Sequence, residues 1–222
     1  MLWIALDGVD AVGKTTQARI LYNRFSKKYR TALLGEFSNS PVGDLIVEII
    51  RKKRFFSIDD DKKSPVADSF LLISDMLYKA EKEVQNDTEL IISDRGLLSL
   101  LVYQALRIEK NSRFFVDGNY DSFRFLEEIL DKTFLPIIKP TFHIVYTLKP
   151  ENINKYSVNR GEPPLLKDEL NFLENIQMKI VGKISQTNGY VLPIDSLSIE
   201  EVSFLTESIV ENEIRKNLSK TI

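Results

Sequence analysis

The chain has no cysteine and only one histidine, His143, among its 222 residues. The first absence excludes disulfides, thiolate nucleophiles and zinc sites built on cysteine. The second excludes a metal site with several histidine ligands, and any Ser–His–Asp triad would depend on this one residue. Because His143 lies inside a predicted strand, we expect it to have a structural role.

Long apolar runs and an excess of charge are also missing. No stretch reaches the roughly 20 apolar residues that a membrane-spanning helix needs. Residues 1–7 lack the basic start and long apolar core of a signal peptide, so we expect a cytoplasmic protein. The chain has 30 Lys and Arg against 32 Asp and Glu, a formal charge of −2. This balance argues against a protein that coats nucleic acid or a membrane, and we expect neither as a partner.

Short apolar runs alternate with helical patterns along the whole chain. The predicted strands are Leu2–Leu6, Thr31–Leu34, Glu89–Asp94, Thr141–Leu148 and Gly189–Ile194. The predicted helices cover residues 14–28, 40–54, 65–84, 97–109, 123–132, 152–159, 168–186 and 199–218. This alternation is typical of an α/β fold with a parallel sheet covered on both faces. Since there is no internal repeat or linker, we expect residues 1–222 to form one domain.

The segment after the first predicted strand fits the pattern G-x-x-x-x-G-K-[ST] at every required position. An apolar strand precedes it and an amphipathic helix follows, which is the context of a phosphate-binding loop. The glycines let the backbone turn tightly, so that consecutive amide N–H groups and a helix N-terminus face an oxyanion. The expected nucleotide-binding residues are Gly8, Asp10, Ala11, Val12, Gly13, Lys14, Thr15 and Thr16.

The motif indicates a nucleoside triphosphate but not the reaction, because GTPases, motor ATPases and small-molecule kinases share it. The N-K-x-D run that recognises guanine is absent, which disfavours a switch GTPase. Lys14 is expected to reach the β- and γ-phosphates, and the Thr15 hydroxyl to bind Mg²⁺. Asp94 ends another apolar strand, where a carboxylate can hold Mg²⁺ through water. Arg95 beside it offers a planar fork for a phosphate.

Four segments together resemble the thymidylate kinase family of nucleoside monophosphate kinases. They are Leu6–Gln17, Ser93–Arg95 with Ser99 and Tyr103-Gln104, the Arg160 segment with residues 168–179, and residues 191–202. The resemblance implies the three-layer P-loop NTPase fold, with a five-stranded parallel sheet and a short lid at about 150–166. It also implies Mg²⁺, ATP as the phosphoryl donor, and dTMP as the acceptor that becomes dTDP. Since family members commonly dimerise, a homodimer is expected too.

The same resemblance assigns roles around the acceptor. Asp10 would meet the sugar hydroxyl of the acceptor nucleotide, and Tyr103 would pack against that sugar. Together with Lys14, the expected catalytic residues are Arg95 and Arg160, which neutralise charge on the moving phosphoryl group. Arg160 is needed because Ala11-Val12 occupy the place where some members of the family carry an arginine.

The acceptor site departs from the family pattern in two places. Only Glu36 remains of the Arg-Glu-Pro-like run after the second strand. Ile73 and Leu77 stand where the family has a base-stacking phenylalanine and a base-binding arginine. Phe70, about one helical turn before Ile73, is the expected substitute platform. A buried bond to a charged group contributes on the order of 1.5–3 kcal/mol, so the acceptor base stays open at this point.

Two other functions also stay open. Deoxynucleoside kinases share the phosphate loop and use a carboxylate after strand two as a base on the sugar hydroxyl, and Glu36 occupies that position. The replacements at Ile73 and Leu77 suggest a nucleotide-binding protein without catalysis. Asp94-Arg95 followed by Tyr103-Gln104 favours the monophosphate kinase over both.

Overall fold

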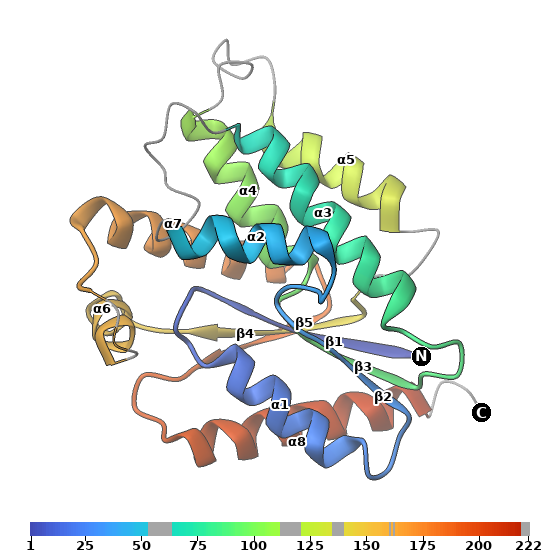
Figure 1. The fold of residues 1–222 in the computed structure, drawn as a ribbon. Helices are drawn as coiled ribbons and strands as arrows, with labels where there is room; N and C mark the ends of the chain where they lie inside the picture. Colours follow the sequence, from blue (N-terminus) through green and yellow to red (C-terminus); the bar gives the residue numbers. More distant parts are fainter. Residues whose placement is uncertain (53–63, 112–120, 135–139, 160, 162, 219–222) are drawn as a thin grey trace.

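The computed structural model describes residues 1–52, 64–111, 121–134, 140–159, 161 and 163–218. These residues form five strands and eight helices (Figure 1). The strands are β1 (Leu2–Gly8), β2 (Thr31–Leu34), β3 (Leu90–Asp94), β4 (Phe142–Thr147) and β5 (Gly189–Pro193). The helices are α1 (Lys14–Phe25), α2 (Pro41–Lys52), α3 (Pro65–Lys82), α4 (Leu97–Asn111), α5 (Ser122–Phe134), α6 (Pro150–Asn159), α7 (Lys167–Ile184) and α8 (Ile199–Leu218).

The strands form one parallel sheet in the order β2-β3-β1-β4-β5. β1 lies at the centre, where Leu6 pairs with Asp94 of β3 on one side and with Ile144 of β4 on the other. All residues of β1 and β3 are buried, as expected for strands with apolar side chains on both faces. The predicted five-stranded α/β fold is therefore confirmed.

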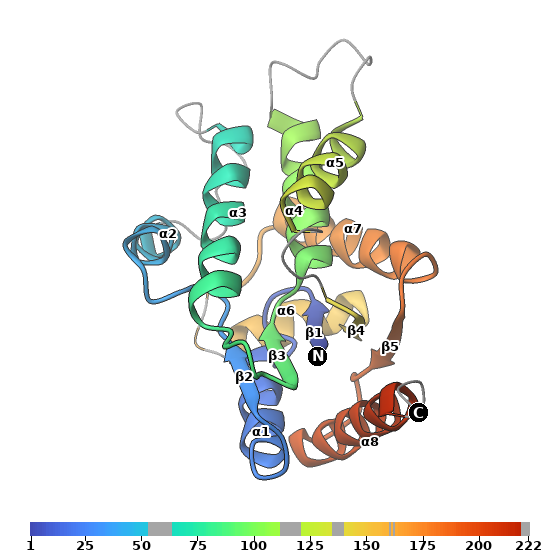
Figure 2. The ribbon, with the colours of Figure 1, turned by 90° about the vertical axis from the view of Figure 1, so that its right-hand side faces the viewer.

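Helices cover both faces of the sheet and make three layers (Figures 1 and 2). α1 and α8 lie on one face, and α3, α4 and α7 lie on the other, with α5 packed outside α4. Along β1, Trp3 belongs to a hydrophobic cluster shared with α3, α4 and α5, whereas Ile4 and Leu6 belong to the larger cluster that includes α1 and α8. Of the helices described, none is long and apolar enough to span a membrane.

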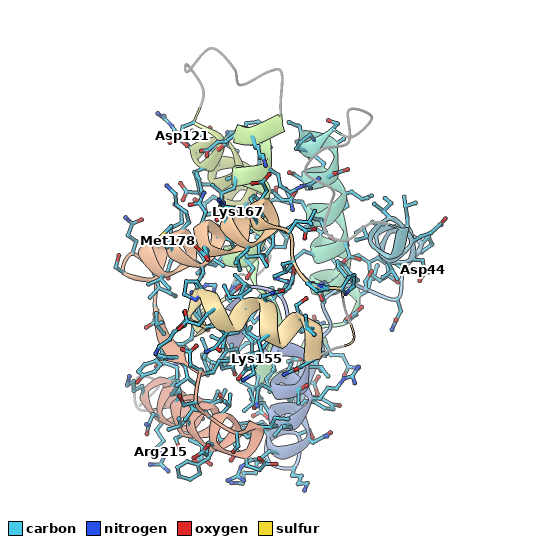
Figure 3. All side chains as sticks on the ribbon, turned by 90° about the vertical axis from the view of Figure 1, so that its left-hand side faces the viewer. Asp44, Asp121, Lys155, Lys167, Met178 and Arg215 are labelled. Atoms are coloured by element: carbon cyan, nitrogen blue, oxygen red, sulfur yellow. The ribbon has the colours of Figure 1, made fainter. Side chains whose placement is uncertain are left out.

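Several element boundaries differ by one to three residues from those that the sequence predicts, and two of these differences have a clear physical reason. β1 continues past Leu6 through Gly8, because Asp7 and Gly8 still pair with Val145 and Tyr146 of β4. α6 begins at Pro150 instead of Asn152, since proline is well tolerated in the first turn of a helix. The strands end at one edge of the sheet, which Figure 3 views with α6 and its labelled Lys155 in front. The candidate site lies at this edge.

Candidate active site

The loop after β1 has the backbone of a phosphate cradle. Gly8 has φ of +135°, and a Cβ there would lie 2.5 Å from the carbonyl oxygen of Tyr146, so only glycine fits. Ala11 and Gly13 also have left-handed backbones, with φ of 67° and 84°. α1 then starts at Lys14 with no side-chain cap on its first amides and no acid in its first turn. Its N-terminus is therefore open to an anion.

Lys14 is a buried cation close to that cradle. Its side chain is 5% exposed, and Nζ donates a hydrogen bond to the carbonyl oxygen of Val9 at 2.6 Å. Burial, and next the positive charge of Arg95, lower the pKa of Lys14 to about 8. An anionic phosphate would reverse this effect, because it favours the charged ammonium.

This shifted pKa predicts that nucleotide binding takes up a proton above pH 8. At pH 9 the free Lys14 amine is about 90% neutral, whereas the phosphate-bound amine is charged. MgADP binding should then take up close to one proton at pH 9 and weaken roughly tenfold per pH unit. Calorimetry in two buffers of different ionisation enthalpy measures the uptake. In Lys14→Arg the guanidinium stays charged, so the same uptake in that variant would contradict the assignment.

Arg95 connects four segments at the sheet edge. It directly follows β3 and has φ of +75°, a left-handed backbone that costs about 1 kcal/mol. Its Nε donates to Glu36 Oε1 at 2.5 Å, Nη2 is paired with Asp10, and Nη1 donates to the carbonyl oxygen of Gly8 at 3.3 Å. Its Cζ also lies 5.0 Å from the ring centre of Tyr103. The guanidinium is thus fixed beside the phosphate loop.

Burial and the neighbouring charges determine the protonation states of Glu36 and Tyr103 around Arg95. Burial alone would raise the pKa of Glu36, but the charges of Arg95 and Lys14 outweigh it and lower that pKa. Glu36 is therefore an ionised carboxylate already engaged by a guanidinium. Burial, and then the charge of Asp10, raise the pKa of Tyr103. The Tyr103 hydroxyl therefore stays protonated, and it is buried with no hydrogen-bond partner among the described residues.

Asp94 and Thr15 fit a magnesium ion. Asp94 is 3% exposed, and its buried Oδ1 has no hydrogen-bond partner in the described part of the chain, which is costly for a carboxylate unless a cation binds it. The Thr15 side chain is exposed at the start of α1. Within the described ranges, no three acidic or histidine side chains gather into a metal site. A single carboxylate with a hydroxyl suits Mg²⁺, which takes its other ligands from phosphates and water.

Asp7 is bonded to the residues that follow Arg95, where α4 begins. Its carboxylate accepts hydrogen bonds from the amides of Gly96 at 3.1 Å and Ser99 at 3.0 Å, and from the Ser99 hydroxyl at 2.5 Å. His143 Nδ1 lies 2.7 Å from its other oxygen. Burial would raise the pKa of Asp7, but these bonds, that of His143 foremost, lower it. Asp7 thus holds the start of α4 beside Arg95, and His143 is buried against it, which agrees with the structural role expected from sequence.

A cavity of about 320 Å³ joins the predicted phosphate-binding residues to an apolar wall. Its lining includes the loop residues 10–16, Glu36 and Arg95. It also includes Gln17, Tyr156, Ile194, Leu197, Ile199 and Val202, most of them apolar. Polar groups for phosphates together with apolar side chains for a flat ring are a suitable lining for a nucleotide.

Phe70, Ile73 and Leu77 of α3 lie away from this cavity. Phe70 does not line this cavity, and its side chain is 47% exposed on α3. Ile73 is 3% exposed inside the hydrophobic cluster of Trp3, and Leu77 packs against the same cluster. Arg160 lies outside the described residues.

Comparisons with known proteins agree with this geometry. A family model described as thymidylate kinase matches residues 6–201. The chain belongs to the thymidylate kinase family. A thymidylate kinase from Nautilia profundicola is 28% identical over 216 residues, covering 94% of this chain and 96% of that protein. One from Aliarcobacter butzleri is 26% identical over 211 residues, covering 94% of this chain and 98% of the relative.

Solved structures of the thymidylate kinase family share the fold. The thymidylate kinase of Candida albicans superposes with a TM-score of 0.67 at 20% identity, covering 96% of this chain and 92% of that one. The enzyme of Ehrlichia chaffeensis gives a TM-score of 0.64 at 14% identity, covering 95% and 97%. At these identities the likeness concerns the fold, which is the three-layer P-loop NTPase fold that the sequence predicts.

The sequence of this thymidylate kinase family member does not reveal every residue at or near the site. It indicates Asp7 only as part of a motif and gives no sign of Tyr156, because nothing local shows that Tyr156 borders the cavity. Asp75 and Lys79 of α3 are both buried against the connection that contains Glu36. Their spacing of four residues is typical of an exposed helix pair, so sequence alone gives no signal of burial.

Proposed function

We propose that this protein transfers the γ-phosphoryl group of ATP to dTMP, giving ADP and dTDP. Membership of the thymidylate kinase family supports ATP as the phosphoryl donor and dTMP as the acceptor. The observation that carries the reaction type is the fixed guanidinium of Arg95 beside the phosphate loop, with Glu36 and Asp10 paired to it. A single kinase domain, a homodimer and a cytoplasmic location belong to the same proposal, because they rest on the sequence and the family.

On the phosphoryl-donor side, the loop amides, Lys14 and Thr16 hold the phosphates of ATP, and the apolar residues that line the cavity accept its base. Lys14 gains its full charge as the phosphates arrive. Mg²⁺, held by Thr15 and Asp94, would neutralise charge on the same phosphates. Phosphoryl transfer needs mainly positioning and such positive charge, so the lack of cysteine and the structural role of the one histidine are no obstacle.

On the acceptor side, Arg95 holds the phosphate of dTMP, and Asp10 and Tyr103 orient its sugar. The phosphate oxygen that attacks is already anionic, so it needs orientation rather than a base. Glu36 keeps the guanidinium in place. Arg160, assigned by family resemblance, would place positive charge beside the phosphoryl group during its transfer. Phe70 stays the proposed platform for the base.

A comparison of dTMP with thymidine, in wild-type protein and in Glu36→Gln, tests this function. With MgATP, the wild-type protein should phosphorylate dTMP and leave thymidine unchanged. Glu36→Gln should raise the KM for dTMP about tenfold and change kcat only a few-fold, because a charge-assisted bond to Arg95 is lost. A panel of other nucleoside monophosphates defines the base. Glu128→Gln, at an exposed position on α5, is the control.

The alternatives give different results in the same experiment. A deoxynucleoside kinase would prefer thymidine and would lose 10²–10⁴-fold in rate, roughly the contribution of a general base, in Glu36→Gln. The lowered pKa of Glu36 and its bond to Arg95 disfavour that role. A protein without catalysis would bind nucleotides and form no product.

A further inference from the structure

The connection between β2 and α2, residues 35–40, contains Glu36 and is bonded to α3. Figure 2 shows this connection passing beside the lower part of α3. Lys79 Nζ donates to the carbonyl oxygens of Gly35 at 2.9 Å and Glu36 at 2.8 Å. The Asp75 carboxylate accepts from the Ser38 amide at 3.1 Å and from the Ser38 hydroxyl. Two charged side chains of one helix thus hold the connection at two points.

Both charged side chains are deeply buried. Those of Lys79 and Asp75 are 1% and 2% exposed, and Nζ lies 3.5 Å from the carboxylate. An ammonium has three hydrogens, and here it faces two carbonyl oxygens and one carboxylate. A buried ion pair stabilises a fold no better than apolar residues of similar size. Stability alone therefore does not explain the pair, whereas the geometry of the connection does.

The same connection continues toward both the site and α2. Ser38 Oγ lies 2.7 Å from Ser40 Oγ, and Ser40 Oγ accepts from the amide of Gly43 in the first turn of α2. Glu36, two residues before Ser38, reaches Arg95 Nε at 2.5 Å. Most connections of this kind are held less firmly than the elements they join. Here a continuous set of bonds runs from α3 through the backbone of residues 35–38 to the guanidinium of Arg95.

We propose that Asp75 and Lys79 are positioning residues for the acceptor site, acting through Glu36 on Arg95. They touch neither nucleotide. They fix the backbone on both sides of Glu36, so that its carboxylate meets the guanidinium that the proposed function assigns to the acceptor phosphate. The inference rests on that function for the identity of the bound phosphate.

A double-mutant cycle with Glu36→Gln tests this proposal. The variant Asp75→Asn/Lys79→Met removes both charges together, so no lone charge stays buried. It should lower kcat/KM for dTMP by roughly 10- to 100-fold, the order expected from a misplacement of about 1 Å. The KM for ATP should change less than about twofold. Added to Glu36→Gln, the same pair should cost little more, because its effect passes through Glu36.

Two further variants keep the test decisive. Ser38→Ala removes only the hydroxyl that donates to Asp75, and should give a smaller loss with the same dependence on Glu36. If Asp75→Asn/Lys79→Met does not fold, the dependence of the Ser38→Ala effect on Glu36 tests the positioning role instead. Asp68→Asn/Arg107→Met removes another largely buried ion pair, which joins α3 to α4, and its effect should multiply with that of Glu36→Gln.

The outcomes separate the two proposals. If the wild-type protein forms no dTDP, the proposed function fails. If it forms dTDP but the effects of Asp75→Asn/Lys79→Met and Glu36→Gln multiply fully, the positioning role is wrong. Equal changes in the KM of ATP and of dTMP would also contradict it, because they would indicate a general loss of structure.

Discussion

Lys14→Met should lower kcat by about 10²–10³-fold, as expected when a fixed positive charge on the reacting phosphates is lost. The side chain of Lys14 is buried beside the open N-terminus of α1, and the described residues place no acid in the first turn of that helix. Steady-state rates with saturating MgATP and dTMP measure the effect. Near-normal turnover would contradict the assignment of the loop.

The stability of this variant should not follow its activity. Burial lowers the pKa of Lys14, which means that the folded protein without nucleotide disfavours the charged amine. Methionine has a similar length and no charge, so the free energy of unfolding without nucleotide should stay the same or rise. Chemical denaturation at pH 7 checks this. A clear loss of stability would show that the bond to Val9 outweighs the cost of burying the charge.

Arg95→Met should have the second large effect, a loss of roughly 10²–10³-fold in kcat/KM for dTMP. It removes the planar fork for the acceptor phosphate and leaves Asp10 and Glu36 without their shared partner. Arg95→Lys should recover little, because one ammonium cannot replace two separated N–H contacts and the stacking on Tyr103. Arg124→Met, at an exposed arginine of α5, is the control.

The effect of Arg95→Met should concentrate on the acceptor. The KM for ATP should change only a few-fold, since Lys14 and the loop amides remain. Measuring KM for each nucleotide while the other saturates separates the two sides of the site. If Arg95→Met mainly raises the KM for ATP, the assignment of the Arg95 guanidinium to the acceptor phosphate is wrong.

The phosphate loop and the sheet could be predicted because their signals are local. Gly8 and Gly13 are required by backbone conformation, and the buried strands β1 and β3 are continuous apolar runs. Asp94 and Arg95 could be placed near the loop because parallel strands end at one edge. The pairing of Arg95 with Glu36 could not be foreseen, since it depends on how the connection after β2 folds back.

The features that could not be predicted from the sequence depend on packing between segments far apart in the chain. Asp75 and Lys79 have the spacing of a solvent-exposed pair, and only the approach of residues 35–38 to α3 buries them. In the sequence, Ile73 stands at the position where the family has its base-stacking phenylalanine. In the structure it is a core residue in the same hydrophobic cluster as Trp3. The direction of a side chain on a helix with apolar residues around much of its surface is decided by its neighbours, not by its own segment.

Transfer of a labelled phosphoryl group from ATP to dTMP is the most direct test of the proposed reaction. The protein is incubated with Mg²⁺, ATP labelled with ³²P at the γ-position, and dTMP, and the products are separated by chromatography. We expect label in dTDP, formed in equal amount with ADP, and roughly 10²–10³-fold less of this product in Lys14→Met at the same times. Label released only as inorganic phosphate, or nucleotide binding with no labelled dTDP, would contradict it.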